Sequence, residues 1–170
     1  MEARSCLPMQ LFVCLMFAAS IFAATVDGIQ IHSSINGKGP QTVILVHGWT
    51  CDETAWKWQV PELATDFRAI TLDLPGHGKS GSPKDGKLTM DLFARAIEAV
   101  RSEAKADRVA LVGHSMGTPV IMHYARLYPQ HVVALVFVDG AVKLPQNAED
   151  SLRSSAKRFA DPGGLKAREA

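Results

Sequence analysis

Short apolar-rich runs alternate with longer amphipathic segments through most of this chain. A run without polar breaks predicts a strand that is buried on both faces of a sheet, whereas apolar residues spaced three and four apart predict a helix. The expected strands are residues 42–46, 68–73, 109–112 and 132–138, and the expected helices are residues 54–67, 88–104 and 119–127. Strands that alternate with helices in this way form a mostly parallel sheet with helices on both faces. The pattern therefore predicts an α/β fold.

The segment before the first of these strands alternates with a period of about two residues. Ile29, Ile31 and Ile35 follow this period, and Asp27-Gly28 is a dipeptide typical of hairpin turns. Residues 25–40 are therefore expected to form a β-hairpin.

The third apolar run ends in Gly113-His-Ser-Met-Gly117, which has the spacing G-x-S-x-G. A helix is expected directly afterwards, with Pro119 tolerated in its first turn. A strand, a sharp turn and a helix in this order make a nucleophile elbow, which holds a strained serine clear of the backbone. Ser115 is therefore the candidate nucleophile, and the helix N-terminus beneath it favours developing negative charge.

Three segments in order carry a family resemblance: Val46-His-Gly-Trp49, Asp73-Leu-Pro-Gly-His-Gly-Lys-Ser80 and the elbow. They resemble the α/β-hydrolase fold superfamily, in particular its cap-bearing esterases, lipases and perhydrolases. The resemblance covers residues 26–140. It implies that residues 25–140 are the N-terminal part of a hydrolase core, C-terminally incomplete, and that residues 141–170 begin the cap or lid region.

The same resemblance implies an oxyanion hole. Its two donors would be the backbone N–H groups of Trp49 and of Met116, the residue after the nucleophile. Two fixed donors aimed at a tetrahedral oxyanion are worth about 10²–10³ in rate each. The other interpretation of His47-Gly48 is that it merely ends a strand.

A hydrolase of this fold also needs an acid and then a histidine after its serine in the chain. His123 would lie about 12 Å further along the same helix at 1.5 Å per residue, and His131 would lie at the wrong end of the sheet. His114 should point into the scaffold, and the resemblance gives His47 and His77 supporting roles. His32 lies on the edge hairpin, so the sequence offers no convincing base.

Asp139 ends the last expected strand and is a possible acid. A turn residue beside Gly140 is the alternative interpretation. Two strand–helix units and most of a lid would be missing, on the order of 100 residues at 30 or more per unit.

The resulting expectation is a serine-dependent hydrolase that acts on a carboxylic ester or related acyl substrate through an acyl-Ser115 intermediate, in a fragment that lacks the histidine and, unless Asp139 serves, the acid. Perhydrolases and carbon–carbon bond hydrolases share this serine pattern, whereas haloalkane dehalogenases and epoxide hydrolases carry aspartate there. The alternative from another class is a non-catalytic pseudoenzyme or binding module that keeps the hydrolase scaffold.

Composition limits the partners. Apolar residues make up 47% and charged residues 21% of the 170 residues, and the net charge is +1, so nucleic acid is not an expected partner. Gly78-Lys-Ser80 fails the phosphate-loop pattern because Asp73 stands where a glycine is needed. No cofactor and no metal are expected, and the partner is a small acyl or ester substrate. Oligomeric state is not predicted.

The N-terminus resembles a targeting segment. Residues 11–24 are apolar, uncharged and end in small residues, which is typical of a secretory signal peptide. Residues 1–24 are therefore expected to be cleaved after Ala24, or at the small residues 18–20, and the protein to be secreted or periplasmic. An uncleaved membrane anchor is the alternative. Cys51 is the one cysteine outside this segment, so no internal disulfide is expected after processing.

Overall fold

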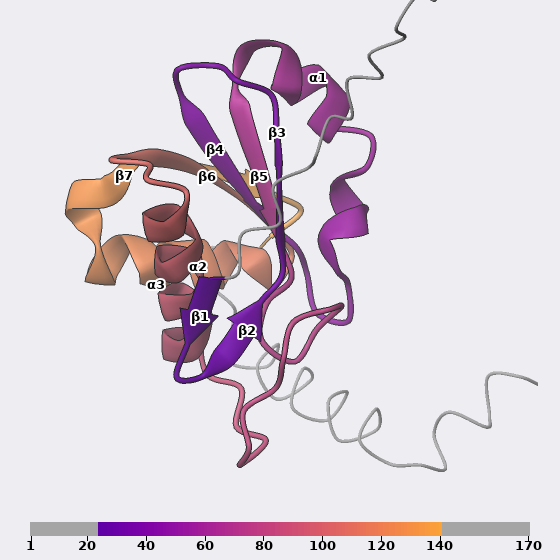
Figure 1. The fold of residues 1–170 in the computed structure, drawn as a ribbon, viewed down its shortest axis with the longest axis vertical. Coiled ribbons are helices and arrows are strands. Elements are labelled where there is room, and N and C mark those ends of the chain that lie inside the picture. The colour runs from indigo at the N-terminus through magenta and orange to yellow at the C-terminus, as the bar shows by residue number, and fades with distance from the viewer. Residues whose placement is uncertain (1–23, 141–170) are drawn as a thin grey trace, which may run out of the picture.

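The centre of the fold is a five-stranded sheet with the strand order β3-β5-β4-β6-β7 (Figure 1). The computed structural model describes residues 24–140. The strands of this sheet are β3 (Ser33–Asn36), β4 (Thr42–Val46), β5 (Arg68–Leu72), β6 (Val109–His114) and β7 (Val132–Val138). β4, β5, β6 and β7 are parallel to one another, and β3 is antiparallel to β5. The predicted mostly parallel α/β sheet is confirmed.

The parallel register brings three loops to one edge of the sheet. Val46, the last residue of β4, pairs with Leu72 of β5 on one side and with Gly113 of β6 on the other. The loops that follow these three strands therefore emerge side by side. They are the segments that carry His47-Gly48-Trp49, Asp73 to Ser80, and Ser115.

Helices cover both faces of the sheet. Ile44 and Val46 of β4 face a core formed with α2 (Met90–Glu103) and α3 (Gly117–Leu127). Val43 and Leu45, which alternate with them, face a second core with the 3-10 helix η1 (Glu53–Trp56) and α1 (Val60–Asp66). Thr89 caps the N-terminus of α2, because its side chain accepts a hydrogen bond from the Leu92 N–H at 3.1 Å.

The predicted N-terminal hairpin is shorter than expected. β1 (Ala24–Val26) and β2 (Ile29–Ile31) pair around Asp27-Gly28, both with positive φ, and pack beside α2 (Figure 1). The chain then leaves this hairpin, because residues 33–36 form the antiparallel edge strand β3 of the main sheet.

The helix expected over residues 54–67 is interrupted. It consists of η1 and α1, separated by a turn, and Pro61 lies in the first turn of α1. Proline has no N–H to donate and its ring collides with the preceding turn of a helix, so a helix can begin at Pro61 but cannot run through it. The predicted apolar face is nevertheless right: Trp56, Val60, Leu63 and Phe67 all pack in the second core.

The prediction that residues 132–138 are fully buried is wrong. Within residues 24–140, β7 pairs only with β6 and forms the edge of the sheet. Val133 is 59% exposed and Val136 is 47% exposed. An apolar run thus identified the strand correctly, but it could not show that one side of the strand lacks a neighbour among the described residues.

The predicted signal peptide and cap region lie outside the described residues. Ala24 itself begins β1 and pairs with Ile31, so cleavage after Ala24 would remove one residue of that strand. Among residues 24–140, no helix has the length and apolar character that a membrane crossing requires.

Candidate active site

Ser115 occupies the strained turn that the sequence predicts. β6 ends at His114, Ser115 has a φ of 51°, and α3 begins at Gly117. The turn is held on both sides, since the Ser115 N–H donates to the Val138 carbonyl at 3.1 Å and the Thr118 N–H donates to the Ser115 carbonyl at 3.0 Å. Ser115 is exposed. A strained, exposed serine at a strand-to-helix turn has the geometry of a nucleophile elbow.

The elbow lies directly against the end of β4. A Cβ on Gly117 would collide with the Val46 carbonyl oxygen and would lie 2.9 Å from the His47 carbonyl oxygen. Any side chain at position 117 would therefore push α3 away from β4. The close approach places the helix start, and with it Met116, next to the loop that follows β4.

The loop that carries Trp49 lies beside the nucleophile. A Cβ on Gly48 would stand 3.1 Å from the Ser115 Cβ and 3.1 Å from the His114 Nδ1. The expected donors, the N–H groups of Trp49 and Met116, thus belong to two segments that meet at Ser115. The Trp49 side chain is 45% exposed, and its ring contacts the His77 ring edge-on at 5.1 Å between centroids.

His47 supports this loop and has no free nitrogen for catalysis. Its Nε2 accepts a hydrogen bond from the Leu74 N–H at 3.0 Å, so its Nδ1 carries the proton that it donates to the Gly48 carbonyl at 2.7 Å. Burial lowers the pKa of His47, which keeps the ring neutral. The lone pair that a base would need is therefore already occupied.

His77 is also part of the scaffold. It is buried, and its Nδ1 donates to the Pro75 carbonyl at 3.1 Å. The ring packs between those of His47, Trp49 and Phe93, with centroid distances of 5.2, 5.1 and 6.1 Å.

The remaining histidines have partners other than Ser115. His32 contacts Glu53 at 2.7 Å, His123 contacts Asp91 at 3.4 Å, and His131 contacts Glu98 at 3.3 Å. His114 packs edge-on against Trp56. All six histidines of the chain fall within residues 24–140, and in that range no hydrogen bond joins Ser115 to a histidine ring.

Asp139 lies next to the elbow, because the preceding residue, Val138, accepts the hydrogen bond from Ser115. Its φ of 46° is that of a residue in a tight turn, and its side chain is exposed. No histidine partner of Asp139 is found between residues 24 and 140, and its role as an acid stays a prediction.

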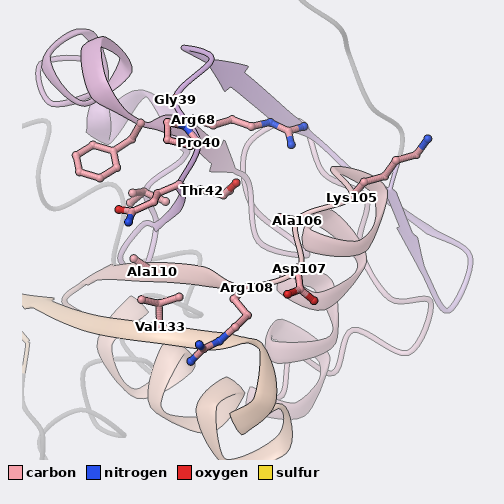
Figure 2. Close-up of a pocket in the computed structure, with 13 residues that line it drawn as sticks. Gly39, Pro40, Thr42, Arg68, Lys105, Ala106, Asp107, Arg108, Ala110 and Val133 are labelled. Carbon is pink, nitrogen blue, oxygen red and sulfur yellow. The ribbon is translucent and has the colours of Figure 1, made fainter.

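A cavity in the described part of the chain lies far from this chemistry. It measures about 400 Å³, and Figure 2 shows residues that line it. It opens at the amino ends of the parallel strands, where β4 and β5 begin with Thr42 and Arg68, whereas Ser115 follows the carboxyl end of β6. Thr42, Arg68 and Val133 line it, together with the turn that carries Lys105 to Arg108.

In residues 24–140, no group of three or more histidine, cysteine or acidic side chains is arranged to hold a metal ion.

Glu53 is a polar centre that the sequence did not predict. Its Oε1 contacts the His32 Nε2 at 2.7 Å and the Lys79 Nζ at 3.2 Å, and its Oε2 accepts from the Thr71 hydroxyl at 3.0 Å. The carboxylate is mostly buried, with 13% of its side chain exposed. Its partners come from segments far apart in the chain, so no local pattern could have indicated it.

Acid should weaken the fold through Glu53. Burial alone would raise the pKa of this carboxyl, but hydrogen bonds from Ser34, His32, Thr71 and Lys79 outweigh it and lower the pKa from 4.5 to about 2. A group whose pKa is lower in the folded state contributes stability above its unfolded pKa, and that contribution is lost as the pH falls. We expect the urea midpoint to drop between pH 4.5 and 2, and to drop less in Glu53→Gln. Parallel midpoint curves for the two proteins would contradict this assignment.

Comparison with known proteins places this geometry in a family. The family model described as alpha/beta hydrolase fold matches residues 41–161. The chain therefore belongs to the alpha/beta hydrolase fold family, as its sequence resemblance implied.

The relatives are longer proteins. The dihydrolipoyllysine-residue acetyltransferase component of the acetoin cleaving system of Cupriavidus necator is 35% identical over 71% of this chain and 32% of its own length. A serine hydrolase-like protein of Danio rerio is 29% identical over 85% of this chain and 45% of its own length. The solved structure of a thermophilic esterase from Thermogutta terrifontis has a TM-score of 0.73 and 31% identity, over 88% of this chain and 56% of that one. The chain thus spans from about a third to somewhat more than half of the length of these proteins.

Proposed function

We propose that Ser115 is the nucleophile of an acyl hydrolase that cleaves a carboxylic ester or a related acyl compound. The observation that carries this proposal is the left-handed, exposed Ser115 at the strand-to-helix turn, with Gly48, the residue before Trp49, close against it. The relatives include a serine hydrolase-like protein and an esterase, which supports the same chemistry.

In the proposed reaction, Ser115 Oγ attacks the acyl carbon and its proton passes to a base. The tetrahedral oxyanion forms against the N–H groups of Trp49 and Met116, and its collapse expels the alcohol, which takes up the proton. Water then attacks the acyl-serine, releases the carboxylic acid and restores the serine hydroxyl. The net reaction is the addition of water across the acyl bond, and it requires no oxidant or reductant.

The proposed reaction needs a base that residues 24–140 do not place at Ser115. We therefore propose that the 170 residues are the N-terminal part of a longer enzyme, whose histidine and acid follow in the missing length. The share of the relatives that the chain covers supports this proposal. By itself, the 170-residue chain should show little or no turnover, because the serine hydroxyl is a weak nucleophile at neutral pH without a base.

The second candidate is a binding protein that keeps the hydrolase scaffold without turnover. It is favoured by one observation: each of the six histidines of the chain has a hydrogen-bond partner, an ion-pair partner or a ring contact other than Ser115. Under this alternative, the full gene product would bind acyl compounds but would never form a covalent adduct.

Covalent trapping with a fluorophosphonate separates the two candidates. We expect the natural gene product to gain one adduct, mapped by peptide mass spectrometry to Ser115, and the 170-residue chain to react at least about 100-fold more slowly, in keeping with the usual contribution of a general base. An unlabelled gene product, or an adduct at another serine, would exclude Ser115 as the nucleophile.

A further inference from the structure

The loop that presents Trp49 is anchored at its two ends. At its start, the buried His47 binds the Leu74 N–H through Nε2. At its other end, the Glu53 N–H donates to the Asp73 Oδ1 at 2.6 Å. Between these anchors the Gly48 carbonyl accepts a hydrogen bond from the His47 Nδ1 at 2.7 Å and a longer one from the Cys51 N–H at 3.3 Å. The Trp49 ring packs on His77, and Thr50 is in the left-handed region with a φ of 61°.

The second anchor is reinforced because the Glu53 side chain is also held in place by hydrogen bonds. Its two carboxylate oxygens are held by His32, next to the edge strand β3, by Thr71 of β5 and by Lys79 of the loop after β5. These donors come from three separate segments of the chain. A movement of Glu53 would therefore break several hydrogen bonds at once and leave mostly buried polar groups unpaired, which is costly.

Asp73 and the residue that follows it connect the two anchors of the Trp49 loop. The Asp73 carboxylate accepts the Glu53 N–H through Oδ1 and the Lys79 N–H through Oδ2 at 2.8 Å. The next residue, Leu74, supplies the N–H that His47 accepts. Both ends of the Trp49 loop are therefore hydrogen-bonded to the same two consecutive residues, Asp73 and Leu74, which directly follow β5.

We propose that Glu53 is a positioning residue for the oxyanion hole. It fixes the far end of the Trp49 loop, and the position of that end determines the direction in which the Trp49 N–H points. This inference rests on the proposed function, in which that N–H stabilises the oxyanion. Glu53 does not touch the substrate. It acts through the short segment from Trp49 to Asp52. Loss of the Glu53 contacts should therefore make the Trp49 N–H more mobile, while the elbow that carries Ser115 stays in place.

The chain offers a matched control in Glu98. This carboxylate is also mostly buried, and it is held by Arg101 at 2.6 Å, by the Tyr124 hydroxyl at 2.7 Å and by His131 at 3.3 Å. It lies on α2, in the contact with α3, and none of these partners belongs to the Trp49 loop. Glu98→Gln therefore disturbs a comparable polar cluster without touching either anchor.

The test is the backbone order parameter of the Trp49 amide, measured by ¹⁵N relaxation in the 170-residue chain. A rigid backbone gives about 0.85 and a flexible one less than about 0.6. In Glu53→Gln we expect the value at Trp49 to fall toward the flexible range while that at Met116 is unchanged, and in Glu98→Gln we expect neither to change. An unchanged Trp49, or an equal fall in both variants, would overturn the proposal.

Two further measurements complete the test. If Glu53→Gln does not fold, Thr71→Val takes its place, because valine has the same shape as threonine and the change removes one hydrogen-bond donor to the carboxylate. The order parameter of the Trp49 amide is then measured in Thr71→Val, and the same outcomes are expected. In the natural gene product, Glu53→Gln should lower kcat about tenfold and change KM less than about twofold, because an oxyanion donor acts only in the transition state. A change in KM alone would overturn the proposal. A gene product without any turnover would refute the proposed function, whereas the order parameter would still decide the role of Glu53.

Discussion

Ser115→Ala should reduce ester hydrolysis by the natural gene product by about 10³- to 10⁶-fold, the range expected when the nucleophile of a serine hydrolase is removed. The substitution deletes the oxygen that attacks the acyl carbon and leaves Cβ in place, so the left-handed backbone at φ 51° is strained to the same degree as before. Stability should therefore change little. The measurement is kcat/KM for a series of p-nitrophenyl esters, together with urea unfolding of both proteins.

Ser102→Ala provides the control for this substitution. Ser102 is exposed near the end of α2, outside the elbow, and its replacement should leave kcat/KM within about twofold, as expected for a surface change. Turnover that survives in Ser115→Ala would mean that another group attacks the substrate, and the elbow would then be only a structural turn.

Gly117→Ala should destabilise the chain by about 3 kcal/mol, the upper end of the usual cost of overpacking. The added methyl group would collide with the Val46 carbonyl oxygen, and backbone atoms of a central strand cannot rotate away as a side chain can. The collision should separate α3 from β4 and so displace Ser115 from the Trp49 loop. The measurement is the free energy of unfolding from urea titration.

Gly86→Ala is a comparison variant in which the added methyl group makes no collision, although, unlike Gly117, Gly86 has a positive φ. Gly86 has a φ of +68°, which a side chain disfavours, but an added Cβ would meet nothing within 4 Å. We expect a loss of about 1 kcal/mol there, the cost of the left-handed region alone. If the two glycine variants lose equal stability, the close approach of α3 to β4 is not what position 117 requires.

Much of the fold could be predicted because its main signals are local. The four parallel strands are apolar runs, and each lies at or within a residue or two of its expected position. The elbow could be predicted for the same reason, since the strand, the G-x-S-x-G turn and the helix are adjacent in the chain. Even the cap of α2 by Thr89 follows from a residue type at one position.

The rest depends on contacts between distant segments. Glu53 looks like an ordinary loop residue in the sequence, and its role becomes visible only when His32, Thr71 and Lys79 are brought around it. The exposure of β7 depends on which strands flank it, which an apolar run cannot specify. The break between η1 and α1, by contrast, had a local signal in Pro61, and the apolar period of residues 54–67 masked it.

The strain at Ser115 has a consequence for how this sequence can change over generations. An L-residue held in the left-handed region costs about 1–2 kcal/mol, and glycine at that position would be free of the cost. If the Ser115 hydroxyl were no longer needed, mutation of this serine to glycine would stabilise the fold and at the same time end the reaction. Serine should therefore persist at this turn only where selection maintains the reaction. Glycine at this position in a close relative would mark a branch in which the reaction has been lost.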